Sequence, residues 1–138
     1  MIHLKTDQEL LLMEKGGRIL NTVLLKLLNS IRPGVPLSDL DQMAEKEISG
    51  RGATPSFKLV PGYHWSICAC VNEIEVHGIP DDYVIKAGDV VGVDCGVYYE
   101  GFHTDASWTI HVPGKHDDGT KIDAFLRAGK AALHKALD

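Results

Sequence analysis

The stretch KAGDVVGVDCGVYYEGFHTDASWTI, residues 86–110, decides the fold. It contains two runs rich in β-branched and aromatic residues, and only Glu100 and Gly101 separate the run 90–99 from the run 102–112. Two strand-forming runs joined by two residues, with glycine second, predict a tight antiparallel hairpin. The turn then sets the register of both strands, because a hairpin's loop length fixes which residues lie opposite each other.

The predicted hairpin brings two carboxylates together. With a two-residue turn, Asp94 faces Ser107 and Asp105 faces Gly96, so both aspartates project from one face, as diagonal neighbours with β-carbons about 7–8 Å apart. A three-residue turn without a bulge would place them on opposite faces. Two buried carboxylates this close need a compensating charge, and a divalent cation that prefers hard oxygen ligands supplies one. The alternative is that each aspartate caps a turn or pairs with a lysine or an arginine.

Helical periodicity marks the start of the chain. Residues 6–30 begin with TDQE, the form of a capping box, and continue with apolar residues at helical spacing. The pair Gly16 and Gly17 interrupts this stripe. Because glycine costs about 1 kcal/mol against alanine inside a helix, we expect a close helix-to-sheet contact there that needs the missing side chain. The helix should end at residues 32–34, the sequence Arg-Pro-Gly.

Capping residues and glycines also mark the limits of the later elements. A second helix is predicted to open at Ser38 and to end at Gly50. Residues 66–72 read as a further strand. Residues 112–121 form a polar connector, after which a third helix starts at Thr120 and runs to the last residue.

A weak internal repeat appears in the two long helices. Aligning Gly17 with Gly129 places GRILNTVLL over GKAALHKAL, a glycine, a base and then a small or apolar run in both. Short helical stretches also resemble each other by chance. If the repeat is real, residues 1–138 form a single domain that is the first half of a two-repeat protein, with the second repeat beginning near residue 120 and then cut off.

Composition excludes several classes of protein. The 138 residues include 14 Lys+Arg against 19 Asp+Glu, a formal charge of −5, which argues against nucleic-acid or membrane-surface binding. No stretch approaches the ~20 apolar residues of a membrane-spanning helix, and the polar start is not a secretory signal. Three cysteines cannot complete a disulfide framework, which favours a reducing, cytoplasmic setting.

Histidine and cysteine spacing gives weaker signals. His77, in the turn segment HGIP, has two interpretations: a structural hydrogen-bonding group or a catalytic one. A zinc site from His64, Cys68, Cys70 and His77 is conceivable, but this spacing matches no common closed zinc site. From the residues alone, Tyr63 and its neighbour Trp65 are more readily placed in the core than in a pocket.

A longer series of motifs resembles a known family. The run GATPSFKLVPGYHWSICACVNEIEVHGIP, residues 52–80, followed by residues 86–110, closely resembles the type I methionine aminopeptidases. The matching features are GATP, GY followed by SIC, VNE, HGIP, GD, VD and GFHTD, in order and at similar spacing. The resemblance covers essentially the whole chain and reaches about halfway through the family's catalytic domain. It implies the first half of the pita-bread fold, an α/β (α+β) architecture with two N-terminal helices packed on an antiparallel sheet.

The resemblance also implies roles for individual residues. Asp94 matches the aspartate that chelates one metal of a dinuclear pair, and Asp105 matches the aspartate that bridges both metals. His77 matches the histidine that donates a hydrogen bond to the substrate or tetrahedral intermediate. Tyr63 and Cys68 match residues that line the pocket for the methionine side chain. Asn72 lies in the stretch whose backbone holds a monovalent cation in some members.

The implied activity is the hydrolytic removal of the N-terminal methionine from nascent proteins and peptides. In the family this reaction uses hydroxide held by two divalent ions, with Co, Mn, Fe and Zn as candidates. The remaining ligands, a histidine and two glutamates, come from the second half of the family domain and have no counterpart in this sequence. We therefore expect the chain alone to lack part of the site. Its expected partners are a complementary half or a homodimer mate, the peptide substrate and the ribosome exit region.

Two other classes of function remain open at this point. A non-catalytic binding module could keep the fold and lose the metals, although the joint presence of Asp94, Asp105 and His77 argues against it. A proline-specific or creatinase-like hydrolase of the same fold would share the paired aspartates. The series GY, SIC, VNE and HGIP favours methionine removal over both.

Overall fold

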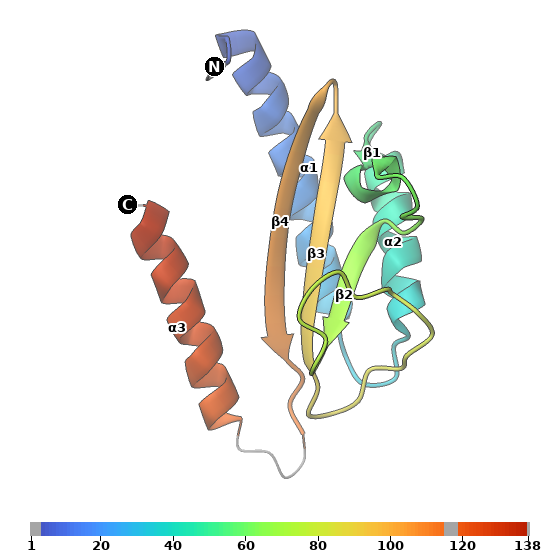
Figure 1. Ribbon diagram of the computed structural model, residues 1–138, viewed down its shortest axis with the longest axis vertical. Coiled ribbons are helices and arrows are strands. Elements are labelled where there is room, and N and C mark those ends of the chain that lie inside the picture. Colours follow the sequence, from blue (N-terminus) through green and yellow to red (C-terminus); the bar gives the residue numbers. More distant parts are fainter. Residues whose placement is uncertain (1–3, 115–118, 138) are drawn as a thin grey trace.

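The computed structural model describes residues 4–114 and 119–137, in which two long N-terminal helices cover one face of an antiparallel sheet (Figure 1). In chain order the elements are α1 (Asp7–Ser30), α2 (Leu37–Ser49), β1 (Thr54–Pro55), the short 3-10 helix η1 (Ser56–Leu59), β2 (Ile67–Val71), β3 (Val90–Tyr99), β4 (Phe102–His111) and α3 (Thr120–Leu137). No helix in these ranges is long and apolar enough to cross a membrane.

Helix α1 forms as its sequence predicts. The hydroxyl of Thr6 accepts from the Glu9 amide at 3.3 Å, and the Glu9 carboxylate accepts from the Thr6 amide at 2.7 Å, which completes the capping box. The apolar stripe of α1 is buried against β3 and β4. Gly16 does lie against the hairpin, but a β-carbon there would sit 3.5 Å from Thr104, an ordinary contact, so the expected need for a missing side chain is wrong. Gly17 faces open space.

Helix α2 begins one residue earlier than predicted. Pro36, with φ −69°, is the N-cap, and its fixed φ suits that position. The Ser38 hydroxyl instead donates to the Asp82 carboxylate at 3.0 Å, so it ties the helix to a distant loop rather than capping it. Gly50 does end the helix but keeps a right-handed conformation, and the left-handed position falls at Gly52, φ 71°.

Strand β3 is the centre of the sheet. It pairs antiparallel with β4 on one edge and with both β1 and β2 on the other. The turn between β3 and β4 has two residues with positive φ, Glu100 at 48° and Gly101 at 92°, as a type I′ turn requires. The predicted register is confirmed: Asp94 pairs with Ser107, and Gly96 pairs with Asp105.

The two faces of the sheet differ sharply in chemistry. Alternate residues of β2 and β3 point toward α1 and α2 and form the core with the helical stripes; those from β3 are Val91, Val93, Cys95 and Val97. The opposite face carries rows of polar and small residues, because directly paired residues share a face. One row is Cys68, Asp94 and Ser107, and the next is Cys70, Gly92 and Thr109.

Helix α3 confirms the predicted third helix within the described residues, although Asp138 and residues 115–118 of the connector lie outside them. None of its described residues is buried. The helix lies alongside the outer edge of β4 (Figure 1), and the Lys130 ammonium sits 5.1 Å above the Trp108 ring. It is therefore the least packed element of the chain.

Candidate metal and substrate site

The carboxylates of Asp94 and Asp105 meet on the polar face of the hairpin. Asp94 is half-buried, and its Oδ1 atom has no hydrogen-bond partner among the described residues. Burial, reinforced by the neighbouring Asp105 carboxylate, raises the pKa of Asp94 to about 6. Asp105 is exposed, so the expectation of two buried carboxylates is wrong for this residue. The requirement for a compensating proton or cation therefore falls on the buried oxygen of Asp94.

His77 is held beside this pair by the glycine that follows it. The Ala69 amide of β2 donates to the Gly78 carbonyl at 2.9 Å, and a β-carbon on Gly78 would come within 2.2 Å of the Ala69 oxygen. Only glycine allows the chain to approach β2 this closely. His77 itself has a left-handed backbone, φ 52°, and its electrostatic interaction with Asp94 lowers the pKa of that carboxyl, in part opposing the effect of burial.

Tyr63 and Cys68 form the next part of the site. The Tyr63 hydroxyl donates to the Ile67 carbonyl at 2.8 Å and contacts the Cys68 sulfur at 3.2 Å. Burial raises the pKa of both groups, so the thiol and the phenol are neutral at physiological pH. Cys68 pairs directly with Asp94 across β2 and β3. A neutral, polarizable wall therefore adjoins the carboxylates.

These residues line one cavity of about 470 Å³. Its lining comprises Phe57, Val60, Tyr63, Cys68, His77, Ile79, Asp94 and Asp105. All five site residues expected from the sequence are brought together here. The prediction that Tyr63 is a core residue is wrong, because Tyr63 is only partly buried and lines the cavity. Trp65 packs against it with ring centroids 5.4 Å apart.

Sequence reasoning missed the apolar residues Phe57, Val60 and Ile79. They belong to η1 and to loops, where no periodicity marks them as part of a common wall. An available signal was that Val60 and Ile79 are large apolar residues beside prolines in segments without helical or strand periodicity. Both remain exposed in the structure, at 55% and 40%, as residues at the mouth of a cavity do.

Asn72 has a structural role that can be described. Its side-chain amide donates to Asp89 at 3.0 Å, and its side-chain oxygen accepts from the Val90 amide at 3.0 Å, which closes the β2–β3 end of the sheet. It also lines a second cavity of about 250 Å³ that adjoins His77 and Asp94. The expectation of a monovalent cation near Asn72 stays a prediction.

The paired aspartates are the candidate metal ligands in the part of the chain that the structure describes. Within residues 4–114 and 119–137, no three His, Cys, Asp or Glu side chains come together to hold a metal ion, so the alternative zinc cluster around Cys68 and Cys70 does not form. Asp94 and Asp105 do fit part of a divalent site, because they offer hard carboxylate oxygens and one of those oxygens is buried without a partner. Two carboxylates supply at most four of the oxygens such a site uses.

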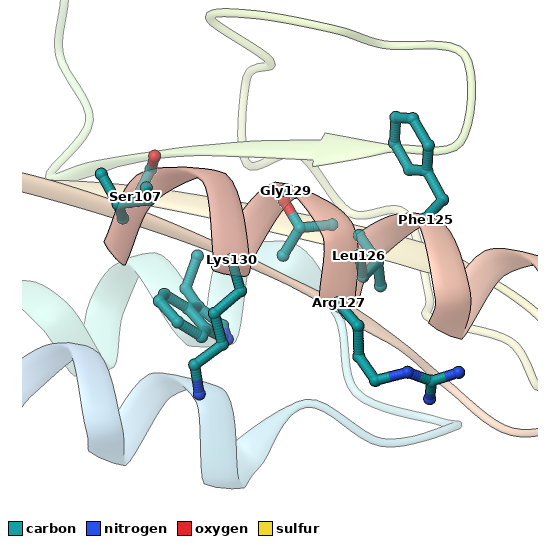
Figure 2. Close-up of a pocket in the computed structure, with 9 residues that line it drawn as sticks. Ser107, Phe125, Leu126, Arg127, Gly129 and Lys130 are labelled. Atoms are coloured by element: carbon teal, nitrogen blue, oxygen red, sulfur yellow. The ribbon is translucent and has the colours of Figure 1, made fainter. Parts of the chain in front are cut away.

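A separate crevice of about 420 Å³ lies between β4 and α3 (Figure 2). Ser107 and Thr109 line its β4 side, and the side chains of Arg127 and Lys130 on α3 extend from the helix toward α1 in this view. The residues that line it include no acid, histidine or cysteine. It offers no metal ligand and is distinct from the carboxylate site.

Comparison with known proteins identifies the family of this chain. A sheet backed by two helices, with paired carboxylates on its open face, is typical of a class of metal-dependent hydrolases, and the family model of metallopeptidase family M24 matches residues 12–138. The chain belongs to metallopeptidase family M24. It is 43% identical, over its full length, to the methionine aminopeptidase of Clostridium perfringens, and the match covers 54% of that relative.

Solved structures support the fold prediction. The crystal structure of a methionine aminopeptidase from Thermotoga maritima superposes with a TM-score of 0.89 at 33% identity, and covers 99% of this chain and 54% of its own. The prolidase of Pyrococcus furiosus matches with a TM-score of 0.72 at 23% identity, over 86% of this chain and 34% of its own, which shows a shared fold. The expected first half of the pita-bread fold is confirmed. The chain spans about half the length of the curated relatives it matches.

Proposed function

We propose that this chain provides the metal-binding and methionine-binding residues of an enzyme that removes N-terminal methionine from peptides and nascent proteins. The observation that carries the proposal is the placement of Asp94 and Asp105 at one end of an apolar cavity lined by Tyr63 and Cys68. Similarity to methionine aminopeptidases over the whole chain supports the same reaction. The setting we propose is the cytoplasm, near the ribosome exit region.

In this proposal Asp94 and Asp105 would hold the divalent ions, and the metal would be drawn from Co, Mn, Fe and Zn. When bound, such ions polarise a carbonyl and lower the pKa of a water molecule. His77 donates a hydrogen bond to the oxygen on which negative charge develops, a contribution typically worth a few kcal/mol. The cavity beside it accepts the thioether side chain, because its lining is apolar and polarizable.

The ligands that two carboxylates cannot supply come from elsewhere in this proposal. A complementary half of the family domain, in the same or another chain, would bring a histidine and two glutamates to the open face of the sheet. A homodimer mate is the alternative partner, but it would duplicate the aspartates without adding those ligand types. The outer edge of β4, which pairs with no other strand among the described residues and lies alongside α3, is the part of the sheet on which either partner would pair.

The experiment is a chimera in which this chain replaces the matching 54% of the Clostridium perfringens relative. We expect it to release methionine from Met-Gly-Met, to lose activity in EDTA and to regain it with Mn²⁺. His77→Ala should lower kcat by roughly 10²–10³ without loss of bound metal. A preference for a proline-containing dipeptide, or turnover that resists the chelator, would contradict the proposal.

A further inference from the structure

The part of the cavity wall formed by Phe57 packs on the hairpin at Gly96. Helix η1 lies on the polar face of the sheet directly above Gly96, where a β-carbon would come within 2.7 Å of the Ser56 β-carbon and 2.8 Å of the Phe57 ring. Gly96 pairs with Asp105. The absence of a side chain at position 96 therefore lets Phe57 pack directly beside the carboxylate pair.

A hydrogen bond fixes the same segment from the other strand. Ser56 is 9% exposed, and its hydroxyl lies 2.6 Å from Nδ1 of His103 on β4. His103 pairs with Tyr98, and their rings pack with centroids 4.7 Å apart. Because His103 is two residues before Asp105, its side chain and that carboxylate share a face of the strand.

Phe57 contacts other residues that line the cavity. Its ring meets Tyr63 edge-on, with centroids 6.3 Å apart, and Tyr63 in turn contacts Cys68. A shift of η1 would therefore change the width of the cavity between its apolar wall and Asp105. No role described above for the carboxylates or for His77 uses His103, Ser56 or Gly96.

We propose that the Ser56–His103 hydrogen bond and the bare surface of Gly96 form a clamp that fixes the Phe57 wall and thereby selects long unbranched side chains over branched ones. This inference rests on the proposed function for the identity of the substrate side chain. His103 is a positioning residue in this arrangement: it acts through Ser56 and touches no reacting atom. Gly96 determines specificity by its size alone.

The test measures the dissociation constants of L-methionine amide and L-leucine amide for the 138-residue chain by NMR titration. His103→Phe keeps a ring to pack on Tyr98 and loses the hydrogen bond, whereas His103→Asn restores a polar atom near the position of Nδ1. We expect the preference for methionine amide to fall about fivefold in His103→Phe and in Ser56→Ala, the scale of one net hydrogen bond. The double variant Ser56→Ala, His103→Phe should lose no more of the preference for methionine amide than either single variant. His103→Asn should retain most of the wild-type preference.

Hydrogen exchange of the Val60 amide reports on the clamp without any ligand, because this amide donates to the Phe57 carbonyl at 3.0 Å inside the clamped segment. Exchange should be faster in His103→Phe and close to wild type in His103→Asn. The matched control is His134→Phe on the exposed face of α3, which should change neither measurement. Gly96→Ala should also reduce the preference; if it fails to fold, the two His103 variants decide.

The outcomes separate the clamp from the proposed function. Unchanged Val60 exchange in His103→Phe overturns the clamp. Faster exchange with an unchanged preference overturns its role in specificity. If neither amide binds the wild-type chain, the role of this chain's cavity in selectivity is contradicted; the chimera described above decides the proposed function separately, and Val60 exchange decides whether the clamp exists as a structural device.

Discussion

Individual glycines, and one buried aspartate, determine much of the local geometry of this chain. Gly78 is the sharpest case, because its missing β-carbon lets the His77 turn rest on the backbone of Ala69. Gly78→Ala should lower the free energy of unfolding by about 1–3 kcal/mol, the usual cost of overpacking, and should move the NMR signals of His77. The control is Gly17→Ala, where open space surrounds the new methyl group and helix propensity predicts a gain of about 1 kcal/mol. Urea denaturation measures both, and equal effects would contradict the packing argument.

A second residue-scale prediction concerns acid stability. Asp89 is buried, which raises its pKa, but hydrogen bonds from the Asn72 amide, the Lys86 amide and the Tyr83 hydroxyl outweigh burial and hold the pKa below its ordinary 3.8. A depressed pKa in the folded state adds stability above pH 3.8, and this stability is lost as the pH falls through the native pKa. Asp89→Asn should therefore lower the free energy of unfolding by about 2 kcal/mol at pH 7. It should also reduce the change of that free energy with pH between pH 5 and 2. An unchanged slope in urea titrations across this range would show that another group controls it.

At the scale of elements, the two-residue turn of the hairpin determines which face carries Asp105. Glu100 has a left-handed φ of 48°, which asparagine tolerates better than glutamate, and Gly101 has φ 92°. Glu100→Asn should raise the free energy of unfolding by about 0.5 kcal/mol, and Gly101→Ala should lower it by about 1–2 kcal/mol because alanine is strained there. Space is not the cause, since nothing lies within 4 Å of a β-carbon at Gly101. Equal stability of the two variants, by thermal or urea unfolding, would contradict the assigned turn.

Elements set by local periodicity could be predicted from the sequence, and those set by distant partners could not. The hairpin register follows from turn length and strand alternation, which is why Asp94 and Asp105 were correctly placed on one face. Strand β1 has two residues, and its partner Tyr98 lies more than forty positions away, so nothing local marks it. The apolar wall at Phe57 depends on β1 and η1 and was missed for the same reason. The start of α2 was misplaced because Ser38 satisfies a loop carboxylate instead of a helix end.

At the scale of the whole molecule, one face of the sheet packs against the helices in the core, and the opposite face carries the candidate site. The open face presents two carboxylates, so the chain alone should bind a divalent ion weakly, with a Kd of about 10⁻⁴–10⁻³ M. The open β4 edge and the exposed apolar residues of α3, Phe125 and Leu137 among them, should also favour association with a partner. Light scattering measures that tendency.

The most direct test of the account is to map Mn²⁺ on the chain by the paramagnetic broadening of backbone NMR signals. We predict broadening centred on Asp94 and Asp105, extending to Cys68 and Ser107, which lie in the same row of the sheet as Asp94. The double variant Asp94→Asn, Asp105→Asn should abolish it, while Asp123→Asn on α3 should not. Broadening centred elsewhere, at the exposed Asp81 and Asp82 for example, or broadening that survives the double variant, would contradict the assignment of the metal site.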